Sequence, residues 1–178
     1  MIDNGADIWV RSMIDDSCCL HAAGISGNVE VIKLLLEKGL DINSKNVNGS
    51  TPLHMACLFG QAKAAKLMLD ERDNMSDVNM HLNRALQITI NSDGVFAPLT
   101  ETARILLENG ADAAMKTHGL SPFHYAVKKP NLPFIKVIFD VCPKFDVKDF
   151  EENTAIEFVL KEKHRDAMKI ILCHLHKQ

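Results

Sequence analysis

A six-residue pattern recurs at fixed spacing and constrains the fold of this chain more than any other feature. Residues 51–56 read Thr-Pro-Leu-His-Met-Ala, and residues 18–23, 33 positions earlier, read Cys-Cys-Leu-His-Ala-Ala. Residues 121–126 read Ser-Pro-Phe-His-Tyr-Ala, and a weaker copy begins at Thr154. Self-similarity at such a period predicts stacked copies of one supersecondary unit.

Each copy reads as the start of a helix. Thr51 suits the capping position, and Pro52 suits the first helical turn, where its missing N–H costs nothing. A second apolar helix is expected after each copy, at residues 31–37, 64–70, 134–140 and 167–172. Gly39 and Gly110 follow two of the expected helices, where a positive φ ends a helix.

The sequence closely resembles ankyrin repeats in its period, in Thr-Pro-Leu-His and in the Leu-Leu-Glu-x-Gly-x-Asp endings at 35–41 and 106–112. The resemblance implies an all-α ankyrin-repeat solenoid, in which antiparallel helix pairs stack and hairpin loops project from one edge. Residues 1–9 resemble the tail of a preceding repeat, which suggests a piece of a longer array. We expect one domain over 1–178, with repeats at about 10–43, 44–79, 80–113, 114–147 and 148–178.

The third repeat departs most from the pattern because it lacks Thr-Pro-Leu-His. Its first helix is predicted at 83–90, with Leu86 in the position of the repeated leucine. A loop at 91–98 is then predicted, followed by a helix at 99–108. Insertions in solenoids map to loops, often on a functional side, but drift in a tolerant loop explains this one equally well.

The sequence gives no support for an enzyme. His21, His54 and His124 recur once per repeat, whereas a catalytic site would not be copied in this way. The resemblance implies instead that each histidine bonds the backbone of the adjacent hairpin. In Cys173-His174-Leu175-His176, adjacent and i+2 residues on a helix point in different directions, and a tetrahedral site would need matched ligands elsewhere, so we do not expect a metal site there. We predict no catalytic residue, no cofactor and no metal.

Composition narrows the partners and the compartment. The formal charge of −3 argues against direct binding of nucleic acid, which needs a basic field. The charge is −6 over residues 1–113 and +3 over 114–178, which either orients a charged partner or reflects an ordinary solvated surface. No apolar run approaches the ~18 residues of a membrane span. Five irregularly spaced cysteines suggest a reducing, intracellular location in cytoplasm or nucleus.

The resemblance implies that a protein partner binds the concave side, which is built from hairpin tips and the exposed side of each first helix. Leu58 and Phe59 stand out as apolar anchors, although they could instead pack against neighbouring repeats. The predicted partner-binding residues are Ile14, Asp15, Ile25, Ser26, Val47, Asn48, Ser50, Leu58, Phe59, Met80, His81, Asn83, Thr117, His118, Leu120, Lys128, Lys129, Phe150, Glu151 and Asn153.

Asn43 resembles the asparagine that is hydroxylated in many ankyrin arrays, because Leu35 and Asp41-Ile42 precede it at the matching spacing. Asn79 has a similar context without the leucine spacing. The alternative is that both asparagines stabilise turns through side-chain hydrogen bonds.

Three classes of function remain open after the sequence has been read. The first is a non-enzymatic protein–protein interaction module. The second is a structural or targeting segment of a larger signalling, channel or ligase protein. The third is an inhibitor of Rel-type transcription factors.

Overall fold

The structure, a computed structural model, describes residues 7–71, 78–91, 96–116, 120–128, 132–141, 148 and 153–175. The described residues form ten α-helices, with one isolated bridge between Arg11 and Cys18 and no strand. In chain order the helices are α1 Cys19–Ser26, α2 Val29–Glu37, α3 Pro52–Leu58, α4 Ala62–Asp70, α5 Val78–Asn91, α6 Phe96–Glu108, α7 Pro122–Lys128, α8 Leu132–Val141, α9 Ala155–Lys161 and α10 Arg165–Leu175.

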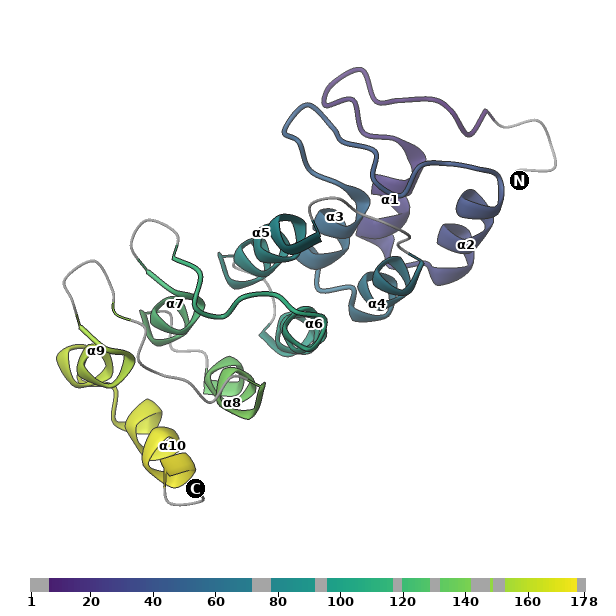
Figure 1. Cartoon of the computed structure of the whole chain (residues 1–178). Coiled ribbons are helices and arrows are strands. Elements are labelled where there is room, and N and C mark those ends of the chain that lie inside the picture. The colour runs from purple at the N-terminus through teal and green to yellow at the C-terminus, as the bar shows by residue number, and fades with distance from the viewer. Residues whose placement is uncertain are drawn as a thin grey trace.

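The helices stack in two parallel rows (Figure 1). The first row contains α1, α3, α5, α7 and α9, and the second contains α2, α4, α6, α8 and α10. Each helix packs against its pair partner and against its neighbours in the same row. Hairpin loops before α1 and α3 project from the side of the first row. The predicted all-α solenoid of stacked helix-turn-helix units is confirmed.

The repeated pattern forms a cap at the start of the first-row helices. The Nδ1 atom of His54 accepts a hydrogen bond from the backbone N–H of Thr51 at 2.9 Å. This bond satisfies one of the backbone donors that a helix start leaves without an intrahelical partner. Pro52 occupies the first helical turn, as predicted. The same bond joins Cys18 to His21 at 3.1 Å and Ser121 to His124 at 3.3 Å.

Glycine ends two of the second-row helices in the predicted way. Gly39 and Gly110 follow α2 and α6 with φ of 89° and 95°, in the left-handed region that favours glycine. The N–H of the next residue then turns back to the helix, and Leu40 donates to the carbonyl of Leu35 at 3.1 Å.

Both helices of the third pair, α5 and α6, begin earlier in the chain than predicted. Helix α5 begins at Val78, five residues before the predicted start at Asn83. Val78, Leu82 and Leu86 lie four residues apart, and no glycine or proline interrupts them, so the helical spacing continues upstream. Met80 and His81, predicted at a hairpin tip, therefore lie in this helix, as does Asn79.

The predicted loop over 91–98 is wrong at its end, because α6 already begins at Phe96. Pro98 lies in the first turn of α6, where proline lacks only a hydrogen bond that the turn would not make. Residues 92–95 lie outside the described part of the chain.

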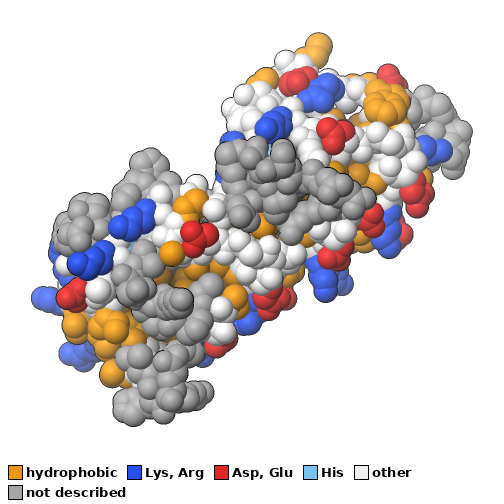
Figure 2. Space-filling view, viewed as in Figure 1, with side chains coloured by type: hydrophobic (Ala, Val, Ile, Leu, Met, Phe, Trp, Pro, Cys, Tyr) orange, Lys and Arg blue, Asp and Glu red, His pale blue; other side chains and the backbone are white. Residues whose placement is uncertain are grey.

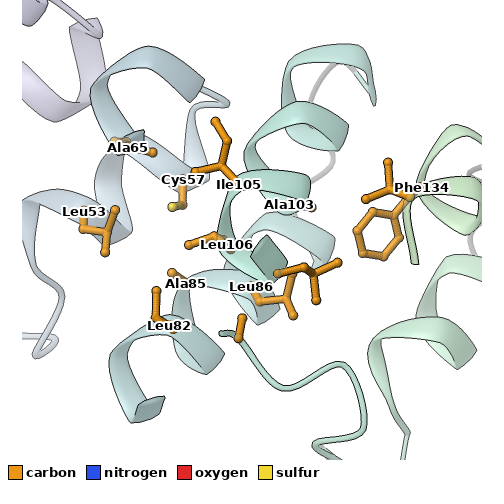
Figure 3. Close-up of a cluster of buried hydrophobic side chains, with 14 of the residues drawn as sticks. Leu53, Cys57, Ala65, Leu82, Ala85, Leu86, Ala103, Ile105, Leu106 and Phe134 are labelled. Atoms are coloured by element: carbon orange, nitrogen blue, oxygen red, sulfur yellow. The ribbon is translucent and has the colours of Figure 1, made fainter. Parts of the chain in front are cut away.

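The core runs continuously between the two rows. The repeated apolar position is buried in the first four repeats, with 0% of Leu20, 6% of Leu53, 0% of Leu86 and 4% of Phe123 exposed, whereas Ile156 in the fifth repeat is partly buried. Figure 3 shows α3, α5 and α6 meeting through large apolar side chains such as Leu53, Leu86 and Leu106, and through small ones that let the helices approach closely. The residues labelled there are Leu53, Cys57, Ala65, Leu82, Ala85, Leu86, Ala103, Ile105, Leu106 and Phe134.

Candidate functional site

The repeated histidines join neighbouring units. Because Nδ1 accepts the capping bond, the proton lies on Nε2, which donates to a carbonyl of the next unit. Nε2 of His21 reaches the carbonyl of Ser50 at 2.9 Å, as the resemblance implies. Nε2 of His54 reaches the carbonyl of His81 at 3.2 Å, which lies inside α5 and not in a hairpin. Both rings are fully buried, which gives them a structural role.

The electrostatic surroundings of His54 keep it neutral. Burial, helped by the positive charge of Arg84, lowers the pKa of His54 to about 4. The hydrogen bond to the carbonyl of His81 opposes this shift without outweighing it. A neutral ring is what the capping arrangement requires, since one nitrogen must accept and the other must donate.

Cys18 takes the place of threonine in the first cap, and its Sγ lies 3.1 Å from Nδ1 of His21. Burial raises the pKa of this thiol, but hydrogen bonds with His21 outweigh burial and lower the pKa to about 7. Only 7% of Cys18 is exposed, so this pair acts as a helix cap with little access for a substrate.

An arginine clasp fixes the first hairpin to the second. Nε of Arg11 pairs with the carboxylate of Asp16 at 2.7 Å, and Nη2 of the same side chain donates to the carbonyl of Lys45 at 2.8 Å. The backbone N–H of Val47 donates to the carbonyl of Asp15 at 2.9 Å. The tips of the two hairpins are therefore bonded side by side.

A second arginine fixes the second hairpin to α5. Nη2 of Arg84 donates to the carbonyl of Asn48 at 2.7 Å, and Nη1 donates to that of Gly49 at 3.3 Å. Within the hairpin, the side-chain oxygen of Asn46 accepts from the N–H groups of Asn48 and Ser50 at 3.1 and 2.9 Å. The hairpin backbone is held at several points and is ordered without any partner.

Large apolar side chains project from these two fixed hairpins. The exposed fraction is 95% for Ile14 and 67% for Val47. In Figure 2, hydrophobic side chains reach the surface at the outer edge of the N-terminal half. We define the hairpin patch as the exposed residues Trp9, Val10, Met13, Ile14 and Val47.

A second exposed line follows the first-row helices. The seventh residue after each capping residue is Ile25 in α1, Leu58 in α3, Lys128 in α7 and Lys161 in α9. All four are exposed, with fractions of 38% for Ile25 and 37% for Leu58. Phe59 follows Leu58 and is 52% exposed. We define the stripe as Ile25, Leu58, Lys128 and Lys161, with Phe59 beside it.

Most of the predicted partner-binding residues that the structure describes are accessible. Those with exposed side chains are Ile14, Ile25, Ser26, Val47, Asn48, Leu58, Phe59 and Lys128. Those that are partly buried are Asp15, Asn83 and Asn153, and the candidate hydroxylation site Asn43 is also partly buried. Thr117, His118, Lys129, Phe150, Glu151 and the side chain of Met80 lie outside the described part of the structure.

Three predicted partner-binding residues are corrected because their side chains are buried. Ser50 is 6% exposed, since its carbonyl accepts the bond from His21 and draws the residue under the preceding unit. His81 is 9% exposed and faces the ring of His54, with 5.6 Å between the ring centroids. Leu120 is 6% exposed because, next to the capping residue, it packs into the apolar core.

Sequence reasoning missed six residues that shape this surface: Trp9, Val10, Arg11, Met13, Arg84 and Lys161. Lys161 could have been found by counting seven residues from Thr154, as Lys128 lies seven from Ser121. Nothing in the sequence shows that Arg11 and Arg84 reach hairpin carbonyls 34 to 36 residues away.

The described residues contain neither a group of metal ligands nor a membrane-spanning helix. Among the described residues, no three His, Cys, Asp or Glu side chains are grouped so as to hold a metal ion. None of the described helices has the length and apolar character needed to cross a bilayer.

Comparison with known proteins identifies the family. The family model described as ankyrin repeats in many copies matches residues 20–69, which include most of α1, all of α2 and α3, and most of α4. The chain is an ankyrin repeat protein. Ankyrin repeats are generally non-catalytic units that mediate protein–protein interaction, and the histidine bonds described above join two consecutive repeats.

The relatives are parts of larger regulatory and channel proteins. Protein phosphatase 1 regulatory subunit 12A of Mus musculus is 39% identical over 70 residues, which are 39% of this chain and 7% of that protein. The transient receptor potential cation channel subfamily A member 1 homolog of Caenorhabditis elegans is 24% identical over 159 residues, 89% of this chain and 13% of the channel. Ankyrin repeat protein nuc-2 of Neurospora crassa is 26% identical over 168 residues, 78% of this chain and 16% of that protein. The chain thus spans less than a fifth of the length of each.

Proposed function

We propose that this ankyrin array is a non-enzymatic module that binds a protein partner through the hairpin patch and the stripe. The observation that supports this most directly is the exposure of large apolar side chains on the first two repeats, from Ile14 at 95% to Leu58 at 37%. Exposed apolar patches on a protein surface typically mark interaction sites, which makes these side chains candidates for one.

The rigidity of the backbone beneath these side chains favours the same function. Arg11 and Arg84 hold the two hairpins through backbone carbonyls. The hairpin backbone therefore loses little conformational freedom when a partner binds. A preorganised surface keeps more of its contact energy as affinity. Phe59 is a candidate anchor because aromatic side chains dominate the energetics of many interfaces.

Affinity capture followed by mass spectrometry tests the proposal with three forms of the chain. The wild type should retain a specific partner, Phe59→Ala should lose most of it, and Leu172→Ala should retain it. Leu172 is 46% exposed on α10 in the second row, which makes it a matched apolar control away from the surface. Equal recovery with all three forms would contradict the proposed surface.

The substitution must also leave the fold intact for the capture to be interpreted. Since half of Phe59 is exposed, Phe59→Ala should change the free energy of unfolding by no more than ~1 kcal/mol. A larger loss, measured by urea unfolding, would assign Phe59 to the core instead.

A narrower candidate follows from the phosphatase relative. The similarity to a protein phosphatase 1 regulatory subunit makes protein phosphatase 1 the first partner to test. Direct binding of the purified phosphatase, weakened by Phe59→Ala, would support it, and absence of binding at micromolar concentrations would remove it.

The remaining hypotheses stay predictions. The small share of each relative that the chain covers supports a targeting or scaffolding segment of a larger signalling, channel or ligase protein. An inhibitor of Rel-type transcription factors would be indicated by co-purification with such a factor. All of these functions place the array inside the cell, in cytoplasm or nucleus.

A further inference from the structure

The stripe changes chemistry along the array while its position in each repeat stays the same. Ile25 and Leu58 are apolar, and Lys128 and Lys161 carry positive charge. Asn91 holds the corresponding place in the third repeat, 33 residues after Leu58. A single line of equivalent positions therefore runs from an apolar end through a neutral centre to a cationic end.

At the cationic end of the stripe, Lys128 has no acidic partner among the described residues. Its side chain is exposed to solvent. Lys161 is followed directly by Glu162, so the positive end of the stripe is centred on Lys128.

Cations also border the centre of the array. Among the described residues, exposed Arg84 donates only to the neutral carbonyls of Asn48 and Gly49. Lys45 is also exposed, three residues before Asn48, whose carbonyl accepts from Arg84.

The acidic groups of the hairpin edge are already engaged. Asp16 pairs with Arg11 at 2.7 Å, and Asp15 accepts from the hydroxyl of Ser17 at 2.7 Å. Among the described residues, Asp16 is thus neutralised by Arg11, whereas Lys45, Arg84 and Lys128 have no ion-pair partner. Figure 2 shows Lys and Arg side chains along the same edge of the C-terminal half.

The spacing of the first-row helices sets the size of a ligand that reaches both ends. Packed helices lie about 8–10 Å apart, so two steps from Leu58 on α3 to Lys128 on α7 cover roughly 16–20 Å. An extended chain advances about 3.3 Å per residue, so five or six residues cover this distance.

We propose that the stripe binds an extended protein segment that carries apolar side chains at one end and acidic side chains five or six residues away. The apolar end contacts Ile25, Leu58 and Phe59, and the acidic end meets Lys128. This inference rests on the proposed protein-binding function and adds the chemistry of the partner. Charged contacts of this kind select the partner and its direction more than they raise affinity.

Selection from a phage-displayed library of random 16-residue peptides on the immobilised array tests the inference. Enriched peptides should contain an apolar pair and an Asp or Glu pair separated by about four to seven positions. Enrichment of basic or purely apolar peptides, or no enrichment above a blank surface, would overturn it.

Variants locate the contacts of the enriched peptide, synthesised with a fluorophore and measured by anisotropy. Leu58→Ala should weaken its binding by about tenfold, and Lys128→Glu by roughly fivefold with a smaller dependence on salt. Leu172→Ala and Lys136→Glu, both exposed on second-row helices, should leave it unchanged. Equal effects of Lys128→Glu and Lys136→Glu would overturn the assigned direction of charge.

The two proposals fail in different ways. If affinity capture finds a partner that depends on Phe59 while no peptide of the expected pattern binds, the linear acidic ligand is wrong and the protein-binding function stands. If capture is insensitive to Phe59 and peptides do not bind, the surface itself is wrong.

Discussion

Acid should destabilise this array through His54 in particular. The folded chain holds the ring neutral, with a pKa of about 4, while an unfolded histidine titrates near its ordinary value of 6.5. Between these values the unfolded chain binds the proton and the folded chain does not. The stabilising contribution of neutral His54 is therefore complete above pH 6.5 and is lost as the pH falls through about 4.

The magnitude follows from the difference between the two pKa values. One unit corresponds to about 1.4 kcal/mol, so full protonation costs roughly 3 kcal/mol. At pH 5 the unfolded histidine is almost fully protonated and the folded one is still neutral, which gives a loss of about 2 kcal/mol relative to pH 7.5. This loss is a large share of the stability of a domain of ordinary size.

His54→Gln removes the titrating group and keeps an acceptor for the N–H of Thr51, since glutamine at this place completes a capping box. The variant should be about 1 kcal/mol less stable at pH 7.5, because it loses the bond to the carbonyl of His81. Its further loss between pH 7.5 and pH 5 should be about 2 kcal/mol smaller than that of the wild type.

Urea unfolding followed by circular dichroism at both pH values measures the two losses. Every other titrating group is present in both proteins and cancels in the difference. Equal pH dependence in wild type and variant would show that His54 is accessible to protons in the folded state and would refute the reasoning.

Three further outcomes are expected. Gly24→Ala places a Cβ 2.6 Å from the carbonyl oxygen of Pro52, so thermal unfolding should show a loss of about 1–3 kcal/mol. Exposure to an asparaginyl hydroxylase should add one oxygen atom to Asn43, and an unchanged intact mass would remove that site. Cys57 is fully buried, which raises its pKa to about 12, so iodoacetamide should modify exposed Cys173 in the native chain and Cys57 only after unfolding, as peptide mass spectrometry will show.

The parts of the fold that could be predicted are those with local signals. The start of α3 at Pro52 and the left-handed Gly39 after α2 follow from residue types at adjacent positions. Helix α9 shows the same logic with different chemistry, because the carboxylate of Glu157 accepts from the N–H of Thr154 at 2.7 Å in place of a histidine. The helix cap is thus preserved in α9 although Glu157 replaces the histidine of the family pattern.

The start of α5 could not be predicted because the competing signals were of equal local strength. Asn83 is a good capping residue, yet its side chain instead accepts from the N–H of Asp112 at 2.7 Å, a contact 29 positions away. That contact frees the preceding residues to continue the helix back to Val78. Asn83 could either cap a helix or bond the N–H of Asp112, and the choice depends on the packing of the third helix pair.

The candidate surface likewise contains positions whose exposure could be predicted from the sequence and positions whose exposure could not. The exposed places of Leu58 and Phe59 follow from their position in the repeat, but the burial of Ser50 and Leu120 does not. Both precede a capping residue, where the preceding repeat and the core compete with solvent for the side chain. Position within a repeat identifies a surface, while burial at each position depends on the neighbouring repeat.

One geometric fact explains why the stack and the recognition surface can vary separately. His54 and Leu58 lie four residues apart and so on the same face of α3. At the level of His54 the next repeat covers this face, since the ring is fully buried and bonded to the carbonyl of His81. One turn later nothing among the described residues covers it fully, and Leu58 is 37% exposed. The position of Leu58 therefore has little effect on stacking, and the lysine at the equivalent position in α7, Lys128, shows that its chemistry can change while the buried histidine below it stays the same.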